Sequence, residues 1–374
     1  METGKKTIPA FIGVACVWMG THFGPGFASG AQMNIYYVKY GIFGLFMPLV
    51  AMLILGVSLY FTIEYSRIRN RHNFNDYVKD LYSPYQKVMA PLFDFCYLFT
   101  VVCALGACLA SIGSLLEAFI GLPYWIGIGM IIAVILLMSI FGSEIVRILS
   151  SYMMFIVSGL ILLIVIMAFA TGTVDLEGAL ASSKENIPDQ SFGKALWSAV
   201  IYASFQATII CNICSETDTL KNKSESKKSV VAGYIGNVVL MTLVIIMLFG
   251  VTNSYDVLGE TLPLYSILDH IGYKWLTIVY LVLVVLAVAS TGVGFIYSGI
   301  ARFGKVVPVK NERARGAAIA IVLMVGCALA ASFGLTALVS KGFTALGYLN
   351  LPIMIIPAIF VTTYKMRRFK GLPS

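Results

Sequence analysis

The sequence predicts an all-α membrane protein with ten transmembrane helices, and three observations carry this prediction. Of its 374 residues, 59% are hydrophobic and only 12% are charged, whereas a soluble globular protein has about 45–50% apolar and about 25% charged residues. Long stretches almost free of charge recur along the whole chain, each near the roughly 20 residues that a span requires. The basic residues are divided unevenly between alternate connections. No room remains for a sizeable soluble domain.

The uncharged or nearly uncharged stretches, of which 88–119 contains Asp94 and Glu117, give the expected helices in order. They cover residues 7–37, 41–63, 88–119, 122–141, 148–172, 195–215, 229–253, 275–301, 316–340 and 342–364. Three longer connections separate some of them: 65–87, which is basic and predicted to form an interfacial helix, 173–194, and 254–274. The connection 173–194 leaves five spans on each side. We therefore expect one transmembrane domain over residues 1–374, with one five-helix repeat at 7–172 and a second at 194–364.

The net charge of +8 is explained by the position of the basic residues. With the N-terminus in the cytoplasm, 21 of the 26 Lys and Arg residues fall in cytoplasmic segments and five fall outside, as the positive-inside rule requires. This predicts that both termini and residues 65–87, 217–228 and 302–315 are cytoplasmic, with 173–194 and 254–274 outside. The same split makes binding of nucleic acid an unnecessary explanation of the charge.

Motifs for enzymatic chemistry are missing from the sequence. It contains no HExxH, GxSxG, phosphate-binding loop or dinucleotide fingerprint. All seven cysteines lie in apolar stretches, so we expect no disulfide framework. Cys211 and Cys214 have CxxC spacing, but without a second pair or nearby histidines they are interpreted as small apolar residues. We therefore expect a protein that is not an enzyme and has no cofactor.

The first span of each half is interrupted. Residues 20–30 read GTHFGPGFASG, and residues 202–212 read YASFQATIICN. Pro25 removes a backbone donor and clashes with the preceding turn, so the first helix should unwind near Gly20 to Gly26. Unwound backbone inside a membrane is tolerated where it lines a cavity, and paired interruptions point to a transporter binding site. The alternative is a packing face, because the glycines also fit small-xxx-small spacing.

The ten-span plan, its five-and-five division and the segment GTHFGPGFASGAQ resemble the amino acid, polyamine and organocation (APC) transporter superfamily with the LeuT fold. The GxGFASG core is similar to YkvI-like bacterial membrane proteins. The architectural resemblance covers nearly the whole chain and the motif about a dozen residues. It implies two inverted repeats with broken first and sixth helices. It also implies a secondary active transporter that works by alternating access in the bacterial cytoplasmic membrane.

The resemblance also implies a coupling ion. In such transporters sodium lies between the unwound first span and hydroxyls of the eighth, which here gives carbonyls of Gly20, Phe23 and Ala287 with hydroxyls of Ser290 and Thr291. Oxygen ligands without a carboxylate suit a monovalent cation. Alternatively, the two hydroxyls bond to their own helix turn. The proton is the other candidate ion: residues 148–172 hold no lysine, which proton-driven relatives carry on the fifth span, but His22 lies within the first interruption.

The substrate is expected to be small and either zwitterionic or neutral, because apart from His22 the middles of the spans are uncharged. The resemblance favours an amino acid or a derivative, its carboxylate meeting the N–H groups of Gly26 and Phe27, since Pro25 offers none. Gln32 stands where related sequences have a carboxylate. The candidate substrate-binding residues are Thr21, His22, Phe23, Pro25, Gly26, Phe27, Tyr202, Ser204, Phe205 and Gln206.

Several alternatives stay open from the sequence. The aromatic residues near the interruptions can hold an apolar side chain, bind a quaternary ammonium by cation–π contact, or only pack. A proton-coupled carrier or exchanger of a betaine or organic cation is therefore the second hypothesis. A channel or membrane sensor on the same fold is the third. The expected partners are a small solute, sodium or a proton, and the lipid bilayer.

Overall fold

The computed structural model describes residues 9–140, 143–187, 190–304 and 307–368, and every regular element in these ranges is helical. Within these ranges, seven helical segments are long and apolar enough to cross a membrane, and three shorter apolar helices accompany them. These segments agree with the ten expected spans. The chain is an all-α, multi-pass membrane protein.

The first half begins with a divided span and continues with four long helices. The divided span consists of α1 (Ala10–His22), α2 (Pro25–Ala28) and α3 (Ala31–Tyr36), followed by the turn η1 (Val38–Tyr40). The next spans are α4 (Ile42–Arg69), α6 (Gln86–Ile120), α7 (Tyr124–Ile140) and α8 (Ser143–Ala170). The basic connection contains α5 (Phe74–Leu81), whose first turn is capped by the side chain of Asn73. A helix in this connection is thus confirmed.

The second half follows two short helices, α9 (Leu176–Ala181) and α10 (Ser183–Asn186). Its spans are α11 (Phe192–Phe205) with η2 (Gln206–Thr208) and α12 (Ile209–Cys214), then α13 (Lys223–Gly250), α15 (Lys274–Phe303) and α16 (Glu312–Ala331). The last span comprises α17 (Leu335–Ala337), η4 (Leu338–Gly342), α18 (Phe343–Asn350), η5 (Leu351–Ile355), η6 (Pro357–Val361) and α19 (Thr362–Arg368). Between spans lie η3 (Thr217–Thr219) and α14 (Pro263–Ile271). The repeat limits 7–172 and 194–364 stay a prediction.

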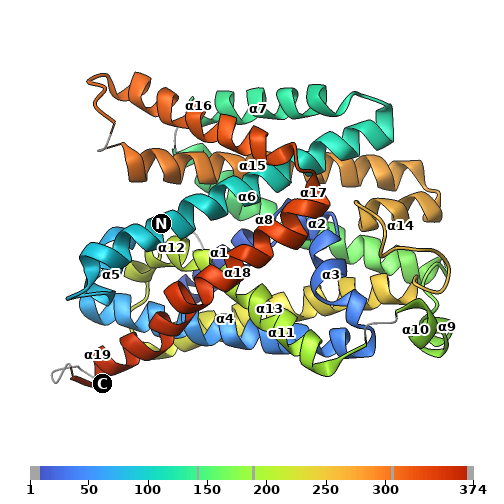
Figure 1. Ribbon diagram of the computed structural model, residues 1–374, viewed down its shortest axis with the longest axis horizontal. Coiled ribbons are helices and arrows are strands. Elements are labelled where there is room, and N and C mark those ends of the chain that lie inside the picture. Colours follow the sequence, from blue (N-terminus) through green and yellow to red (C-terminus); the bar gives the residue numbers. More distant parts are fainter. Residues whose placement is uncertain (1–8, 141–142, 188–189, 305–306, 369–374) are drawn as a thin grey trace, which may run out of the picture.

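The long helices pack in two groups, which Figure 1 shows on opposite sides of the molecule. In the first group α4 packs on α11 and α13, and α13 packs on α1. In the second group α6 packs on α7, α15 and α16. The broken first span lies between the groups, because α1 contacts α13 and α12 whereas α2 contacts α6 and α15. At one end of the bundle lies α5 with α19, here called the basic face, and α9, α10 and α14 lie at the opposite face.

The sixth span is interrupted more mildly than the first. Its two helices are separated only by the three-residue 3₁₀ turn η2, and residues 205–209 keep right-handed helical dihedral angles. The small and polar sequence there has no proline, so the helix tightens instead of unwinding. The side-chain amide of Asn350 donates to the carbonyl of Phe205 at 3.5 Å and supports the turn from the last span.

The predicted boundary between the ninth and tenth spans was wrong. The sequence prediction ended the ninth span at residue 340 because Lys341 is the charged residue there. In the structure α16 ends at Ala331, and the chain turns at residues 332–334, where Gly334 has φ +79°. This left-handed conformation favours glycine, and Lys341 lies inside the helical segment η4. A short glycine turn, rather than a charge, separates these two spans.

Trp18 anchors α1 in the first group of helices. Its side chain is 1% exposed and lies against two glycines. A Cβ atom at Gly233 of α13 would lie 2.4 Å from Trp18, and one at Gly56 of α4 would lie 3.3 Å from it. The two glycines thus leave the space that the indole fills, and α1 is held between α4 and α13.

The second part of the broken span is attached to other elements. The N–H of Leu264 in α14 donates to the carbonyl of Ser29 at 3.1 Å, and the hydroxyl of Tyr280 in α15 donates to the carbonyl of Ala28 at 2.9 Å. Gly30 has φ +83°, and a Cβ atom there would lie 2.4 Å from Leu264. The tight turn at Gly30 therefore depends on glycine, and so does the close packing of α14 against this turn.

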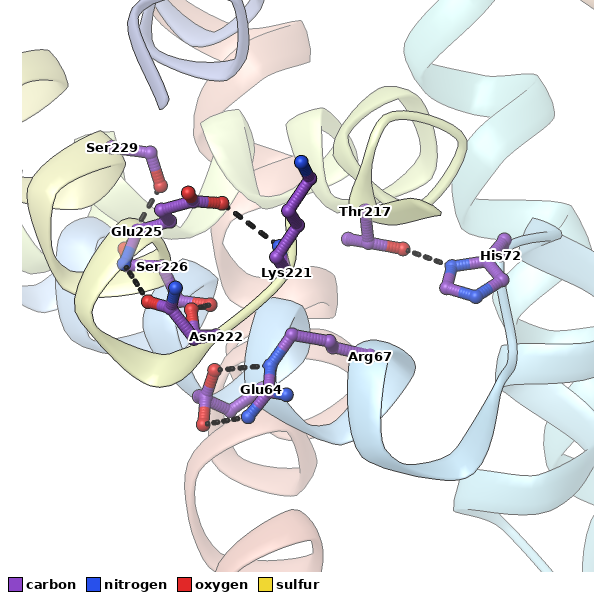
Figure 2. A network of polar contacts seen from close by, with 9 residues as sticks. All are labelled: Glu64, Arg67, His72, Thr217, Lys221, Asn222, Glu225, Ser226 and Ser229. Atoms are coloured by element: carbon purple, nitrogen blue, oxygen red, sulfur yellow. Dashed lines mark hydrogen bonds and ion pairs between the residues drawn. The ribbon is translucent and has the colours of Figure 1, made fainter. Parts of the chain in front are cut away.

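At the basic face, polar contacts join the loop after α4 to the loop before α13 (Figure 2). The hydroxyl of Thr217 donates to the carbonyl of Cys214, and Nδ1 of His72 lies 2.8 Å from Thr217 Oγ1. Asn222 caps α13 by accepting from the N–H of Glu225 at 3.0 Å, and the Glu225 carboxylate accepts from the N–H of Lys221 at 2.8 Å. These contacts order the segment that links the sixth and seventh spans.

The helix α5 is fastened by its Asp80. Arg69 donates two hydrogen bonds of 3.0 Å to this carboxylate, Arg71 adds one at 3.4 Å, and the Lys365 ammonium donates to the Asp80 carbonyl. Burial favours the neutral carboxyl, but the bonds and charges of the two arginines outweigh it and lower the pKa of Asp80. Asp80 thus joins α5 to the ends of α4 and α19.

Candidate functional site

The break in the first span frees backbone carbonyls. The last backbone bond of α1 runs from the N–H of Phe23 to Met19, and the next begins at the carbonyl of Gly24, which accepts from Phe27 and Ala28. Among the described residues, the four carbonyls from Gly20 to Phe23 therefore accept no hydrogen bond. Pro25 lacks an N–H, which explains part of this gap. The predicted break is confirmed, but it is shorter than the expected stretch from Gly20 to Gly26, because α1 continues to His22 and α2 begins at Pro25, which leaves residues 23 and 24 outside helices.

His22 connects three spans beside the break. The side-chain N–H of Asn237 in α13 donates to the carbonyl of Gly233 at 2.7 Å, so its Oδ1 accepts from Nδ1 of His22 at 2.5 Å. Since Nδ1 carries the donated proton, Nε2 of His22 accepts from the hydroxyl of Tyr202 in α11 at 2.8 Å, and the oxygen of that hydroxyl lies 3.3 Å from Oε1 of Gln32. Because buried polar atoms need partners, this network fixes the orientation of the imidazole.

An aromatic layer lies next to this network. It has two parts: the pair Phe23 and Phe27, with ring centroids 4.6 Å apart, and the group of Tyr36, Tyr202, Phe205 and Phe343, with neighbouring centroids 4.8–5.4 Å apart. The imidazole of His22 joins the two parts, 5.2 Å from Phe23 and 5.7 Å from Tyr202. The ring of Phe205 stacks on Phe343 of the last span at 4.9 Å. Such contacts are typical of stable aromatic packing. The layer holds the two halves of the first span against the sixth and tenth spans.

A cavity of about 60 Å³ lies at the break, with room for a few water molecules. The broken span contributes Thr21, His22, Gly24, Gly26 and Gln32, and α6 contributes Tyr97, Thr100, Ala104 and Cys108. The sixth span contributes Phe205, Gln206, Thr208, Ile209 and Asn212, and Thr291, Phe295, Phe343 and Leu346 complete the wall. No lining residue is Asp, Glu, Lys or Arg. The wall of the cavity therefore combines polar side chains with a larger apolar surface, and His22 is the one ionisable imidazole among its described residues.

The predicted substrate-binding residues fall into two sets. Thr21, His22, Gly26, Phe205 and Gln206 line the cavity together. The remaining described ones do not border it: Phe23 and Phe27 belong to the aromatic layer, Tyr202 supports His22, and the hydroxyl of Ser204 donates to the carbonyl of Val200 at 2.7 Å. The side chain of Pro25 lies outside the described residues.

The predicted sodium ligands are only partly brought together. Thr291 lines the cavity, and its hydroxyl has no hydrogen-bond partner among the described residues. The carbonyls of Gly20 and Phe23 belong to the unpaired group at the break. Ala287 is buried one helical turn before Thr291 and does not border the cavity. The side chain of Ser290 lies outside the described residues.

Sequence reasoning missed several residues of the wall. Those of α6 are Tyr97, Thr100, Ala104 and Cys108, which are separated by three, four and four residues and so lie on one helix face. That spacing is a signal that the sequence contained. Asn212, by contrast, is recognisable only in the structure, where its side-chain N–H donates to Thr21 at 3.3 Å. Asn237 was also missed, because its contact with His22 is visible only in the structure.

No metal-ligating cluster of His, Cys, Asp and Glu occurs among the described residues. All seven cysteines are free. Cys211 and Cys214 are buried in α12, and Cys214 contacts the hydroxyl of Ser66 at 3.8 Å. Their surroundings fit apolar packing.

Solved structures share this architecture. A Na⁺-coupled sialic acid symporter in a substrate-bound outward-open state has a TM-score of 0.64 at 14% identity, with 96% of this chain and 91% of that chain covered. MhsT in complex with L-phenylalanine has a TM-score of 0.58 at 15% identity, with 97% and 98% covered. The manganese transporter of Eremococcus coleocola, as a His-to-Ala mutant, has a TM-score of 0.63 at 12% identity, with 96% and 80% covered.

The chain has the LeuT fold. No family model matches its sequence, and no curated protein matches it either. The LeuT fold confirms the predicted fold class and agrees with the resemblance to the APC superfamily, whereas the similarity to YkvI-like proteins stays a prediction. At these identities the likeness establishes the fold alone. In the LeuT fold the broken first span and the sixth span lie beside each other, as α1 and α12 do here.

Proposed function

We propose that this protein is a secondary active transporter that moves an amino acid or an amino acid derivative by alternating access, coupled to sodium. The observation that carries the proposal is the cavity at the break of the first span, whose described wall combines polar and apolar side chains without Asp, Glu, Lys or Arg. Discontinuous helices at the centre of the membrane are typical of transporter binding sites. The structures that this fold resembles are transporters rather than enzymes.

The cavity wall favours a zwitterionic or neutral solute. Uncharged donors and acceptors, such as Gln206, Asn212 and Thr100, border it, and its described wall holds no Asp, Glu, Lys or Arg to neutralise a net charge. A solute with one net charge would then be buried without a partner, which is costly. A zwitterion carries its own balancing charge.

Sodium coupling is supported by oxygen atoms at the break. The carbonyls of Gly20 and Phe23 accept no hydrogen bond among the described residues, and the Thr291 hydroxyl borders the same cavity. These are oxygen donors of the type that sodium prefers, without a carboxylate. We propose that they bind the ion together with the carbonyl of Ala287 and the hydroxyl of Ser290.

A proton-coupled carrier or exchanger of a betaine or organic cation is the second candidate. The observation that favours the proton is the network of His22 with Asn237 and Tyr202, because imidazole exchanges protons near neutral pH. Tyr97, Phe205, Phe295 and Phe343 also border the cavity, and aromatic faces attract quaternary ammonium groups.

We also propose the orientation in the membrane. The basic face is cytoplasmic, so both termini are inside and α9, α10 and α14 are outside, in the bacterial cytoplasmic membrane. The uneven distribution of basic residues supports this assignment. Cavity residues such as Tyr97 and Asn212 lie on the halves of their spans that lead to the basic face.

Two measurements test the proposal. Purified protein is first heated with each of the twenty amino acids and with glycine betaine, with and without sodium, because a ligand of the folded state raises the Tm. Uptake of the compound with the largest effect is then measured in proteoliposomes under separately imposed sodium and proton gradients. Accumulation driven by sodium supports the first candidate, and accumulation driven by protons alone supports the second. A Tm that no compound raises contradicts the substrate class.

A further inference from the structure

Asn212 is a polar residue of the sixth span in the wall of the cavity. It belongs to α12, and its side chain is partly exposed. A side-chain amide carries two N–H donors and one acceptor oxygen. Nδ2 of Asn212 donates to Oγ1 of Thr21 at 3.3 Å, and Thr21 borders the cavity as well. This contact joins the two interrupted spans beside the cavity.

The contact with Thr21 decides which way the Asn212 amide faces. The Thr21 hydroxyl has one proton, and it donates this proton to the carbonyl of Val17 at 2.8 Å, the shorter of its two contacts. Thr21 therefore presents a lone pair to Asn212, which accepts an N–H and repels a second oxygen. The amide nitrogen faces Thr21 for this reason, and Oδ1 lies on the other arm of the amide.

Oδ1 of Asn212 is an acceptor that the protein leaves open. It accepts no hydrogen bond among the described residues, and it is not one of their buried unpaired atoms. The oxygen is thus accessible, in a residue that borders the cavity. Thr208 borders the cavity one helical turn earlier, and its hydroxyl also has no partner within the described part of the chain. Because residues four apart share a helix face, the sixth span offers two open oxygen atoms on one side of the cavity.

We propose that Asn212 is a specificity residue whose Oδ1 accepts an N–H of the solute's ammonium group. The inference rests on the proposed function, in which this cavity is the solute site, and it narrows the substrate class to solutes whose nitrogen carries hydrogen. A primary ammonium offers donors only, which matches an open acceptor. A trimethylated nitrogen has no N–H, so it would cover Oδ1 and leave it without a partner, which is costly. The site therefore selects an amino acid over the corresponding betaine.

Thr21 is a positioning residue in this assignment. Its proton is used by Val17 and one of its lone pairs by Asn212, so it acts on the solute through the amide. Without the Thr21 hydroxyl, nothing would keep the amide nitrogen away from the cavity. An amide that turned its N–H groups toward an ammonium would repel it.

The test compares an amino acid with its N,N,N-trimethyl derivative. The amino acid is the one that raises the wild-type Tm most, and the affinity of purified protein for both compounds is measured by calorimetric titration. We expect the wild type to bind the trimethyl derivative about tenfold or more weakly. Asn212→Leu, which has a similar volume and no side-chain oxygen, should lose about tenfold or more affinity for the amino acid and keep its affinity for the derivative. The preference should therefore disappear.

The control variant is Ser215→Ala. Ser215 is exposed, does not border the cavity, and donates to the backbone carbonyl of Asn212 at 2.7 Å. The preference of this variant should equal that of the wild type. A cavity that merely lacks room for three methyl groups would keep the preference in Asn212→Leu, so this result separates hydrogen bonding from size.

Two changes at Thr21 test the positioning role. Thr21→Ser keeps the hydroxyl and should keep the preference for the amino acid. Thr21→Val keeps the shape but removes the hydroxyl, and it should reduce the preference. An equal loss of affinity for both compounds in Thr21→Val would contradict the positioning role.

The outcomes separate this inference from the proposed function. A wild type that binds the derivative as tightly as the amino acid, or an Asn212→Leu variant that keeps the preference, overturns the inference and leaves the proposed transporter intact. A wild type that no compound stabilises overturns the proposed substrate class and this inference together. If Asn212→Leu does not fold, Asn212→Ala takes its place under the same criterion.

Discussion

Nδ1 of His22 donates to Oδ1 of Asn237 at 2.5 Å, and Asn237 in turn donates to the carbonyl of Gly233. The two residues are 215 positions apart in the sequence. Because the amide orientation of Asn237 is fixed by its own helix, the tautomer of His22 is determined from α13. The seventh span thus sets the direction of the imidazole beside the break.

Asn237→Ala should destabilise the protein. The change leaves Nδ1 of His22 buried without an acceptor, which costs about 1–3 kcal/mol. Thermal unfolding of the purified protein measures the loss. In a His22→Phe background the same change should cost clearly less, since the donor is already absent. Equal losses in both backgrounds would show that the contact does not contribute.

Gly233→Ala should destabilise the protein by about 1–3 kcal/mol through overpacking. The new Cβ atom would lie 2.4 Å from the indole of Trp18, which has little space to move. Gly56→Ala should cost less, because its Cβ atom would lie 3.3 Å from the same ring. The control is Gly13→Ala in α1, where no atom would lie within 4 Å of the new Cβ atom. This variant should be at least as stable as the wild type. If Gly233→Ala left the stability unchanged, the close packing of Trp18 against Gly233 would be contradicted.

Removal of the eighth-span hydroxyls should weaken sodium binding. Ser290→Ala with Thr291→Ala removes two of about five proposed oxygen ligands, so the sodium concentration for half-maximal uptake should rise about tenfold or more. Substrate affinity should fall only through linkage and recover partly at saturating sodium. Thr277→Ala, in the first turn of the same helix, is the control. Sodium-independent uptake by the wild type would refute this coupling whatever the variants do.

Acid should loosen α5 through Asp80. The pKa of Asp80 is lowered in the folded protein, so its ion pairs stabilise the fold above the ordinary pKa of about 4 and this stability is lost as the pH falls through the lowered value. Asp80→Asn should cost about 0.5–1 kcal/mol at neutral pH, because the pairs are partly exposed, and should reduce the acid sensitivity. Thermal unfolding against pH measures both effects. The control Asp76→Asn lies in the same helix, is exposed, and should change neither.

Thiol labelling tests the proposed orientation. In a cysteine-free background, an impermeant reagent added outside should modify Ser182→Cys but not Ser224→Cys, since Ser182 precedes α10 and Ser224 lies at the exposed start of α13. Both should react after the membrane is permeabilised. The reverse pattern would place the basic face outside.

The sequence predicted the broken span well because the cause is local. Pro25 has no N–H, and the glycines around it remove the cost of leaving the helix, so the unwound position followed from neighbouring residues alone. The end of the ninth span was misplaced because a charge was given more weight than Gly334, whose left-handed turn decides the boundary.

The candidate site was only partly predictable. Residues of the two interruptions, such as Gly26 and Gln206, were identified from their position in the sequence. The contacts of Tyr202 and Asn237 with His22 join distant spans, and no local pattern reveals such pairs. Phe23 and Phe27 were expected at the solute, but packing against neighbouring rings places them beside the cavity instead.

The unpaired carbonyls of residues 20–23 also have a mechanical consequence. Trp18 ties α1 to the first helix group, and Leu264 and Tyr280 tie the second part of the span to α14 and α15. Since no backbone hydrogen bond to these four carbonyls has to break, a change in the angle between the two parts meets little resistance. Residues 23 and 24 therefore form a flexible joint between α1, which is held in the first helix group, and α2, which contacts α6 and α15 of the second group.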